Sequence, residues 1–246
     1  MKDYTKRKYD TLLWDIDGTV LNFLEAEKNA IRALFKKYGF PYCTDLMLSH
    51  YSGINRKYWE ALERGEMSKK EILTARFKEF FSIYGLDTEA AESFNKDYQT
   101  ALGDTIVFND GAFDIIKGFK GTFVQCAVTN GTITAQKKKL LVSGLNDLFD
   151  HVFISEELGY EKPSPMFMKC VKEAVPGLTE ERTLIIGDSL TSDIKLGNNT
   201  GIDTCWYNPA GKSNDKGCSV TYEIRNLNEL KDILPSTVGN GPATRS

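Results

Sequence analysis

From residue 105 onward, short runs of β-branched and aromatic residues alternate with segments whose apolar residues recur at helical spacing. Such alternation is typical of βαβ units, and it favours a parallel sheet with helices on both faces. The strand-like runs are TFVQCAVTN (122–130), HVFIS (151–155), TLIIGD (183–188) and DTCWYN (203–208), and the helical segments between them are ITAQKKKLLVSGL, PMFMKCVKEAV and SDIKLGNNTG. YDTLLW (9–14) adds one more strand, so we predict an α/β fold.

Residues 20–104 show helical periodicity and almost no β-rich run. The stretch AEKNAIRALFKKYGF is predicted to be a helix that ends at Gly39. The stretch SKKEILTARFKEFFSIYGL is predicted to be another helix, which begins with a capping box formed by Ser68 and Glu71 and ends near Gly85. These helices interrupt the strand pattern and therefore indicate an insertion.

The chain divides into a core and this insertion. Its 246 residues suffice for one large domain or for a core with an inserted piece. We predict a core domain of residues 1–19 and 105–234, and a helical domain of residues 20–104. Residues 235–246, PSTVGNGPATRS, lack periodicity and are predicted to form a loose tail.

The composition argues against several classes of protein. Hydrophobic residues make up 41% and charged residues 26% of the chain, as in ordinary soluble globular proteins. A net charge of -3 and the lack of a dense Lys/Arg stripe argue against a nucleic-acid partner. The run KKKLL (137–141) is interpreted as the solvated face of a helix.

The cysteines and the absence of targeting signals indicate a reducing compartment. The five cysteines are odd in number, far apart and without a C-x-x-C pair, so neither a disulfide framework nor a zinc site is indicated. The N-terminal stretch MKDYTKRKYDTLLWD forms no signal peptide, and no segment approaches the ~18 apolar residues of a membrane span. We therefore predict a cytoplasmic protein with no membrane partner, present as a monomer or a small homo-oligomer.

The stretch LLWDIDGTVLN (12–22) places an apolar run directly before two aspartates. Alternate residues of an extended strand point to opposite sides, so Asp15 and Asp17 would not both face one ligand if the strand continued. Either one of them uses its backbone or the chain turns there, and Gly18 supplies the freedom to turn. A polar turn after a buried strand is the plainer alternative.

Further polar residues follow the other predicted strands. Because ligands of a parallel sheet bind beyond the carboxyl ends of its strands, these side chains are expected to converge on one edge. The set comprises three carboxylates, a hydroxyl, an amide and an ammonium: Asp15, Asp188, Asp193, Thr129, Asn130 and Lys162. Oxygen ligands of this kind suit Mg²⁺, which usually shares its carboxylates with a phosphate.

The phosphate itself has candidate ligands in this set. Thr129, Asn130 and the amides that open the following helix could hold phosphoryl oxygens. Lys162 could offset the charge of the phosphate and of a carboxylate nucleophile together. In this interpretation Asp15 attacks phosphorus and Asp17 transfers the proton. Taken alone, Thr129 is more typical of a strand-end hydroxyl than of a phosphate ligand, and Asp193 fits the cap of a nearby helix equally well.

Four motifs resemble those of the haloacid dehalogenase superfamily. DIDGT resembles its phosphatase signature D-x-D-G-T, VTNG its second motif, EKPSP its lysine motif and GDSLTSD its acidic motif, in the family's order. The resemblance spans about residues 8–234 and implies a Rossmann-like core, with the insertion as a helical cap of the first type. Within the superfamily, ISEELGYEKPSP, CWYN and NRKYWEALERGEMSKKEI are most similar to the 5'-nucleotidase subgroup.

The resemblance implies a role for each motif residue. Asp15 would be the nucleophile that becomes an aspartyl-phosphate, and Asp17 would protonate the leaving oxygen and later deprotonate water. Mg²⁺ would be held by the Asp15 side chain, the Asp17 backbone carbonyl and Asp188. Asp193 would lie outside the metal ligands, on a water or on Lys162.

The expected activity is therefore magnesium-dependent hydrolysis of a phosphomonoester, with a nucleoside monophosphate as substrate. Alternatives are a phosphatase for a sugar phosphate or phosphoglycolate, and a phosphomutase. A haloacid dehalogenase needs no metal and typically lacks a carboxylate at the position of Asp17, so the acid here argues against it. The intact motifs argue against a non-catalytic binding module.

The substrate's leaving group has two aromatic candidates in the insertion. Trp59 and Tyr58 could stack on a nucleotide base, as aromatic side chains do in nucleic-acid binders. Because they stand at helical spacing, packing inside the insertion is the favoured interpretation of each ring taken singly.

Overall fold

A computed structural model describes residues 8–234 of the chain, so the predicted tail at residues 235–246 lies outside the described residues. Its centre is a six-stranded sheet in the order β3-β2-β1-β4-β5-β6, and every pairing is parallel. The strands are β1 (Thr11–Trp14), β2 (Val124–Thr129), β3 (His151–Ile154), β4 (Thr183–Gly187), β5 (Asp203–Tyr207) and β6 (Tyr222–Ile224). The predicted α/β fold with a Rossmann-like parallel sheet is confirmed, and β6 adds an edge strand that the sequence pattern did not indicate.

The strand order reverses at β1. From β1 the chain passes to β2 and β3 on one side, and from β4 it passes to β5 and β6 on the other. Ligands of such sheets bind where the order reverses, beyond the carboxyl ends of the strands. The end of β1 is therefore the expected place for a site.

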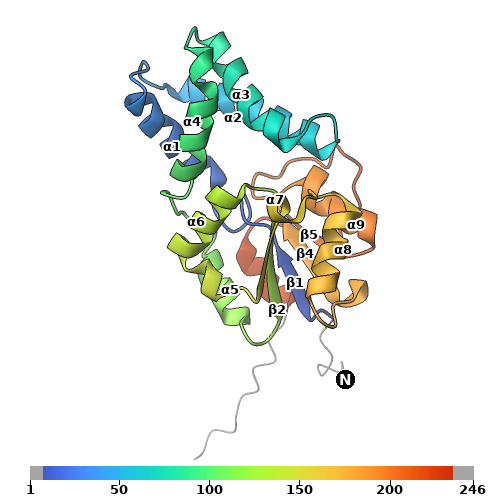
Figure 1. Ribbon diagram of the computed structural model, residues 1–246. Coiled ribbons are helices and arrows are strands. Elements are labelled where there is room, and N and C mark those ends of the chain that lie inside the picture. The colour runs from blue at the N-terminus through green and yellow to red at the C-terminus, as the bar shows by residue number, and fades with distance from the viewer. Residues whose placement is uncertain (1–7, 235–246) are drawn as a thin grey trace, which may run out of the picture.

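Helices cover both faces of the sheet (Figure 1). On one face, α5 (Ala112–Phe119), α6 (Ile133–Ser143) and α10 (Leu230–Ile233) pack on Leu12 and Trp14 of β1. On the other, α8 (Pro165–Ala174) and α9 (Lys195–Thr200) pack on Leu13. The side chains of β1 thus alternate between two hydrophobic clusters, as a strand buried on both faces requires. Short segments complete the fold: α7 (Ser155–Leu158), the 3-10 turns η1 (Thr88–Ala90), η2 (Leu145–Asp147), η3 (Glu180–Arg182) and η5 (Leu227–Glu229), and the π-helical turn η4 (Leu190–Ile194).

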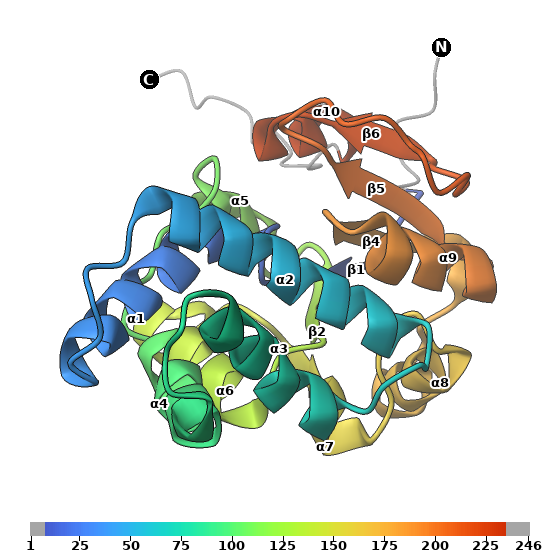
Figure 2. The same ribbon diagram turned by 90° about the horizontal axis from the view of Figure 1, so that it is seen from above.

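Four helices between β1 and β2 form a separate layer, which we call the helical insertion: α1 (Phe23–Lys37), α2 (Asp45–Glu63), α3 (Lys69–Ile83) and α4 (Ala91–Ala101). They lie beyond the carboxyl end of β1, as Figures 1 and 2 show. Their shared core is rich in aromatic rings, among them Phe35, Phe77, Phe80, Phe81, Phe94 and Tyr98. These helices lie within the predicted domain of residues 20–104, whose boundaries stay a prediction.

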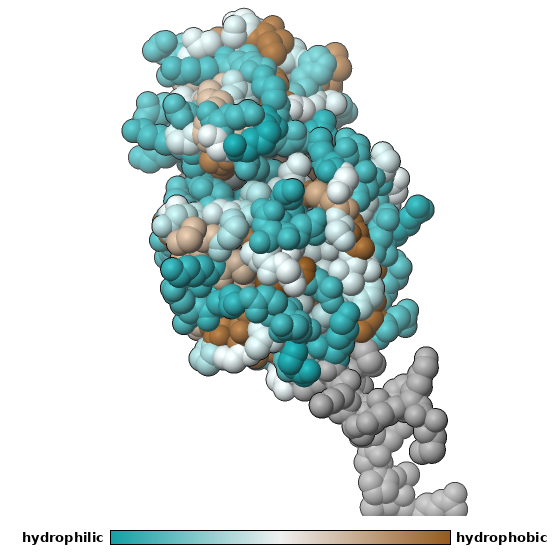
Figure 3. Space-filling view, turned by 90° about the vertical axis from the view of Figure 1, so that its right-hand side faces the viewer, coloured by the Kyte–Doolittle hydropathy of each residue, from teal (hydrophilic) through white to brown (hydrophobic). Residues whose placement is uncertain are grey.

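The local signals that predicted two of these helices are present in the structure. The capping box of Ser68 and Glu71 begins α3, and Gly39 and Gly85 follow α1 and α3 with positive φ. The surface in Figure 3 is mainly hydrophilic, with apolar residues in small groups. Within residues 8–234, no helix combines the length and the apolar character that crossing a bilayer requires.

A buried polar network links the helices of the insertion. The Arg76 guanidinium, 1% exposed, donates to the side-chain oxygens of Asn55 at 2.6 Å and Asn95 at 3.0 Å. Asn55 in turn donates to the Glu27 carboxylate at 2.9 Å, and burial raises the pKa of Glu27. The insertion is thus held by a charged network as well as by its aromatic core.

We expect Arg76→Met to lower the free energy of unfolding by about 3 kcal/mol or more, because it leaves the buried Glu27 carboxylate without its cation. Urea denaturation measures this loss. The control is Lys57→Met, which breaks an exposed pair with Glu79 and should cost less than about 1 kcal/mol. Equal effects of the two variants would contradict the structural importance of the network.

Candidate active site

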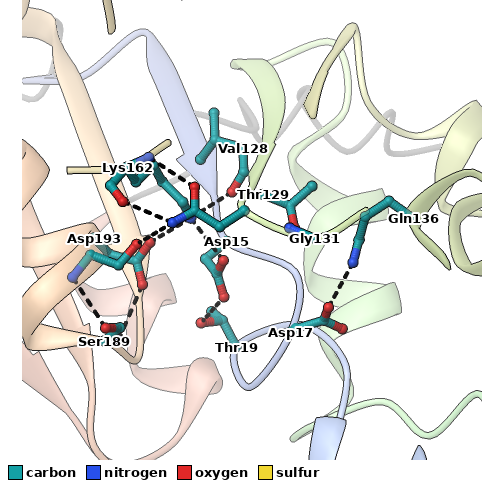
Figure 4. Close-up of polar contacts among 12 residues, drawn as sticks. Asp15, Asp17, Thr19, Val128, Thr129, Gly131, Gln136, Lys162, Ser189 and Asp193 are labelled. Carbon is teal, nitrogen blue, oxygen red and sulfur yellow. Dashed lines mark hydrogen bonds and ion pairs between the residues drawn. The ribbon is translucent and has the colours of Figure 1, made fainter. Parts of the chain in front are cut away.

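Asp15 is the first residue after β1, and its backbone amide still bonds to the Ile186 carbonyl of β4 at 2.9 Å. Its carboxylate is buried and both oxygens are engaged (Figure 4). Oδ1 accepts from Lys162 Nζ at 2.9 Å, and Oδ2 accepts from Thr19 Oγ1 at 3.0 Å. The sheet and these bonds therefore hold Asp15 in a fixed orientation at the point where the strand order reverses.

Lys162 is held by three acceptors. Its ammonium, 1% exposed, donates to Asp15 Oδ1 at 2.9 Å, to Asp193 Oδ1 at 2.7 Å and to the Val128 carbonyl at 2.8 Å. Burial alone would lower the pKa of Lys162, but the carboxylates of Asp15 and Asp193 outweigh it and raise that pKa. Burial raises the pKa of Asp15 to about 7, against the lowering effect of Lys162. A charged lysine thus lies beside the proposed nucleophile.

Thr129 is the last residue of β2, and Asn130 follows it beside this pair. Thr129, 1% exposed, accepts from the Gly131 amide at 3.1 Å through its hydroxyl. The Asn130 side chain is engaged with the backbone of Lys162, donating to its carbonyl and accepting from its amide, each at 2.8 Å. Asn130 therefore stabilises the loop that carries Lys162. Its contact with phosphate stays a prediction.

Three carboxylates form an acidic cluster at the same edge. Oxygens of Asp15, Asp188 and Asp193 all lie within 4.8 Å of one another. Burial, and next the charges of Asp15 and Asp193, raise the pKa of Asp188 well above its usual value. Carboxylates that repel one another in a buried site fit a divalent cation, and an all-oxygen set of this kind suits Mg²⁺.

Two neighbours shape the position of Asp188. Gly18 has φ +102°, and a Cβ there would stand 2.7 Å from Asp188 Oδ2, so the close approach of the two loops needs glycine. Trp206, from the CWYN stretch, donates its indole N–H to the Asp188 backbone carbonyl at 3.0 Å. Asp193 differs from Asp188, because Lys162 and the Ser189 amide already occupy its two oxygens.

Asp17 lies apart from the acidic cluster and its carboxylate turns toward α6 (Figure 4). Oδ2 accepts from Gln136 Nε2 at 2.7 Å, and Oδ1 pairs with Lys139 Nζ at 2.5 Å. Lys139 is only 1% exposed. The interpretation of KKKLL (137–141) as a solvated helix face is therefore wrong for Lys139, because this lysine points inward to an aspartate distant in sequence.

A further carboxylate of the insertion reaches the site and was not singled out from the sequence. Glu63 is the last residue of α2, and its Oε2 is buried without a hydrogen-bond partner among the described residues. Burial raises the pKa of Glu63 to about 7.

Lys69, at the start of α3, donates to Ser155 Oγ at 2.6 Å and so joins the insertion to the core.

The two aromatic candidates lie on α2. Tyr58 donates its hydroxyl to Glu79 of α3 at 2.9 Å, and the Lys57 ammonium lies 4.9 Å from its ring centroid. These contacts tie Tyr58 to other residues of the insertion. Trp59 is partly buried. The stacking role of either ring stays a prediction.

Comparison with known proteins identifies the family. The model of the family described as haloacid dehalogenase-like hydrolase matches residues 12–207, which include every motif residue named above. The chain belongs to this family. The predicted membership is thereby confirmed, and this hydrolase has relatives over almost its whole length.

YfnB of Bacillus subtilis, named as a HAD-hydrolase, is 41% identical over 93% of this chain and 96% of its own. A crystal structure of YfnB, described as bound to magnesium and as revealing interdomain movement, has a TM-score of 0.87 and covers 94% of this chain and 100% of that one. Pyrimidine 5'-nucleotidase PynA of Streptococcus pneumoniae is 36% identical over 94% and 97% of the two chains. Pyrimidine 5'-nucleotidase YjjG of Escherichia coli is 26% identical over 92% and 98%.

Proposed function

We propose that this hydrolase is a magnesium-dependent phosphomonoesterase that acts through an aspartyl-phosphate and uses nucleoside 5'-monophosphates. The observation that carries the proposal is the Asp15 carboxylate, fixed at the strand reversal point between Lys162 and Thr19, with Asp188 in the same acidic cluster. The helical insertion, which lies beyond this edge, acts as the cap over the site.

The proposed reaction consists of two displacements at phosphorus, in which Asp15 and Asp17 take part. An Asp15 oxygen attacks phosphorus, the bond from phosphorus to the leaving oxygen breaks, and Asp17 donates a proton to that oxygen. Asp17 then takes a proton from water, whose oxygen attacks the phosphorus of the aspartyl-phosphate, releases phosphate and restores Asp15. Lys162 offsets the negative charge of Asp15 and the phosphoryl group in both steps.

Metal binding would use the acidic edge. Asp15, Asp188 and the Asp17 backbone carbonyl would hold Mg²⁺, with Asp193 on Lys162 outside the ligand set. When bound, the ion would neutralise charge on the phosphoryl group and orient it for in-line attack. Taking the backbone carbonyl from Asp17 leaves its carboxylate for proton transfer.

The names of two relatives narrow the substrate. PynA and YjjG are both named pyrimidine 5'-nucleotidases, and each aligns with more than nine tenths of this chain. We therefore propose pyrimidine nucleoside 5'-monophosphates as the preferred substrates. A screen of phosphorylated metabolites with Mg²⁺, followed by phosphate release, tests this proposal.

The possible results of the screen are distinct. The highest kcat/KM is expected for a pyrimidine nucleotide. A hexose phosphate or phosphoglycolate hydrolysed far more efficiently would overturn the nucleotidase proposal and leave the phosphatase proposal standing. No release of phosphate from any ester, p-nitrophenyl phosphate included, would overturn both.

We expect Trp59→Ala to raise KM for the nucleotide more than KM for p-nitrophenyl phosphate. Stacking on a base is worth about 1 to 3 kcal/mol, or about 5- to 150-fold in affinity, and only the nucleotide offers a base. Steady-state kinetics with both substrates measure the difference. Tyr58→Phe, which keeps its ring and loses only the bond to Glu79, is the control. Equal rises for both substrates would place Trp59 in the packing of the insertion.

A further inference from the structure

The Asp17 carboxylate is bound on both oxygens by one helix. Lys139 and Gln136 stand three residues apart on α6, so they share one helical face. Their polar ends meet Asp17 at 2.5 Å and 2.7 Å, on different carboxylate oxygens. A carboxylate that accepts from two fixed donors has both of its side-chain torsions set.

The burial of the two donors indicates that they are placed for this aspartate. Lys139 and Gln136 are each 1% exposed, and within residues 8–234 Asp17 is the carboxylate with which Lys139 forms an ion pair. Burying an ammonium costs several kcal/mol unless a charged partner compensates. Gly131 makes room for the arrangement, because a Cβ there would stand 2.1 Å from Gln136 Nε2.

Hydrogen bonds to α4 hold the first two turns of helix α6. Thr132 caps it by accepting from the Ala135 amide at 3.3 Å, and the same hydroxyl donates to Gln99 of α4 at 2.8 Å. Lys138 donates to the Thr100 carbonyl of α4 at 3.0 Å. The helix that carries the two donors is thus fixed to the insertion as well as to the core.

We propose that Lys139 and Gln136 are positioning residues, which fix the Asp17 carboxylate for its proton transfers. This inference rests on the proposed function, in which Asp17 serves the leaving oxygen and then water. Proton transfer in a transition state depends on placement, so an aspartate that samples several rotamers loses much of its contribution. Neither donor touches the substrate in this proposal; both act through Asp17.

The test compares esters that differ in their need for an acid. The nucleoside released from a nucleotide would depart as a poor alkoxide leaving group unless its 5'-oxygen is protonated, whereas p-nitrophenolate departs without a proton. The value of kcat/KM reports the steps up to departure of the leaving group. Lys139→Met is expected to lower kcat/KM for the nucleotide about tenfold or more and that for p-nitrophenyl phosphate less than about threefold. Gln136→Leu removes a donor without removing a charge. It should also lower the ratio of kcat/KM for the nucleotide to kcat/KM for p-nitrophenyl phosphate, by a smaller factor than Lys139→Met does. Lys137→Met, at an exposed lysine of the same helix, should leave the ratio unchanged.

A double-mutant cycle separates positioning from a general effect on the fold. If Lys139 acts through Asp17, then Lys139→Met should add little to the loss already caused by Asp17→Asn. The inference would be overturned if the losses of kcat/KM caused by Lys139→Met and Asp17→Asn multiply in the double variant. It would also be overturned if Lys139→Met and Gln136→Leu each lower kcat/KM equally for both esters.

The same data distinguish this failure from failure of the proposed function. An altered ratio in Asp17→Asn with an unaltered ratio in Lys139→Met and Gln136→Leu overturns the positioning role alone. An unaltered ratio in Asp17→Asn itself overturns the proton-transfer role of Asp17, and the positioning role with it.

Discussion

Asp15→Asn is expected to lower kcat by several orders of magnitude for every phosphomonoester that the enzyme hydrolyses. The amide keeps the shape of the carboxylate but lacks the charge that attacks phosphorus, and loss of a nucleophile has effects of about 10⁴ or more in other hydrolases. Steady-state phosphate release measures the loss. Brief reaction with a radiolabelled phosphomonoester, followed by acid quenching, should label the wild-type chain and leave the variant unlabelled.

The control for Asp15→Asn must show that the fold survives. Lys162 keeps Asp193 and the Val128 carbonyl as acceptors in the variant, so the buried ammonium is not stranded. Asp203→Asn, at the first residue of β5, replaces a carboxylate that bonds to Tyr9 at 2.7 Å and should retain activity. Activity of Asp15→Asn within about tenfold of wild type would contradict the nucleophile assignment.

The sheet and the acidic edge were accessible from the sequence because their signals are local. Each motif except the lysine motif follows a strand directly, and parallel strands bring their carboxyl ends to one edge, so topology alone placed Asp15, Thr129 and Asp188 together. The short edge strand β6 was missed, because three residues between loops carry too little periodicity to detect.

The partners of Asp17 were not accessible, because they depend on contacts between distant parts of the chain. A run of three lysines before two leucines has the pattern of a solvated helix face, and nothing in it distinguishes Lys139 from Lys137. In the structure Lys139 is buried and Lys137 is exposed, because α6 packs with one side toward the loop after β1. The i, i+3 spacing of Gln136 and Lys139 was the available signal, and it required knowledge of the facing aspartate.

The distinction between Asp188 and Asp193 was likewise a matter of packing. The acidic motif supplies both carboxylates, and its spacing alone does not say which one faces a metal. Both lie in the acidic cluster, but Lys162 and the Ser189 amide bind the two carboxylate oxygens of Asp193, whereas Asp188 lies against Gly18. This agrees with the role outside the metal ligands that the resemblance implied for Asp193, which stays a proposal.

Asp188→Asn and Asp17→Asn are expected to lower activity for different reasons. The Asp188 variant loses a proposed ligand and should weaken Mg²⁺ binding by more than about 100-fold, because loss of a residue that merely supports a ligand already costs about 10- to 100-fold. The Asp17 variant keeps its backbone carbonyl and should bind Mg²⁺ nearly as wild type does. Its kcat for a nucleotide should nevertheless fall by about 10² or more, because no acid or base remains.

Titration calorimetry with Mg²⁺ and kinetics at saturating Mg²⁺ separate the two effects. High Mg²⁺ should restore part of the activity of Asp188→Asn and none of that of Asp17→Asn, while EDTA should abolish wild-type turnover. In the proposed mechanism Asp17 serves both purposes, because the metal ligand would be its backbone carbonyl, while its carboxylate accepts from Gln136 and Lys139. Comparable losses of metal affinity in the two variants would show that the Asp17 side chain itself supports the metal, and would contradict this division of labour.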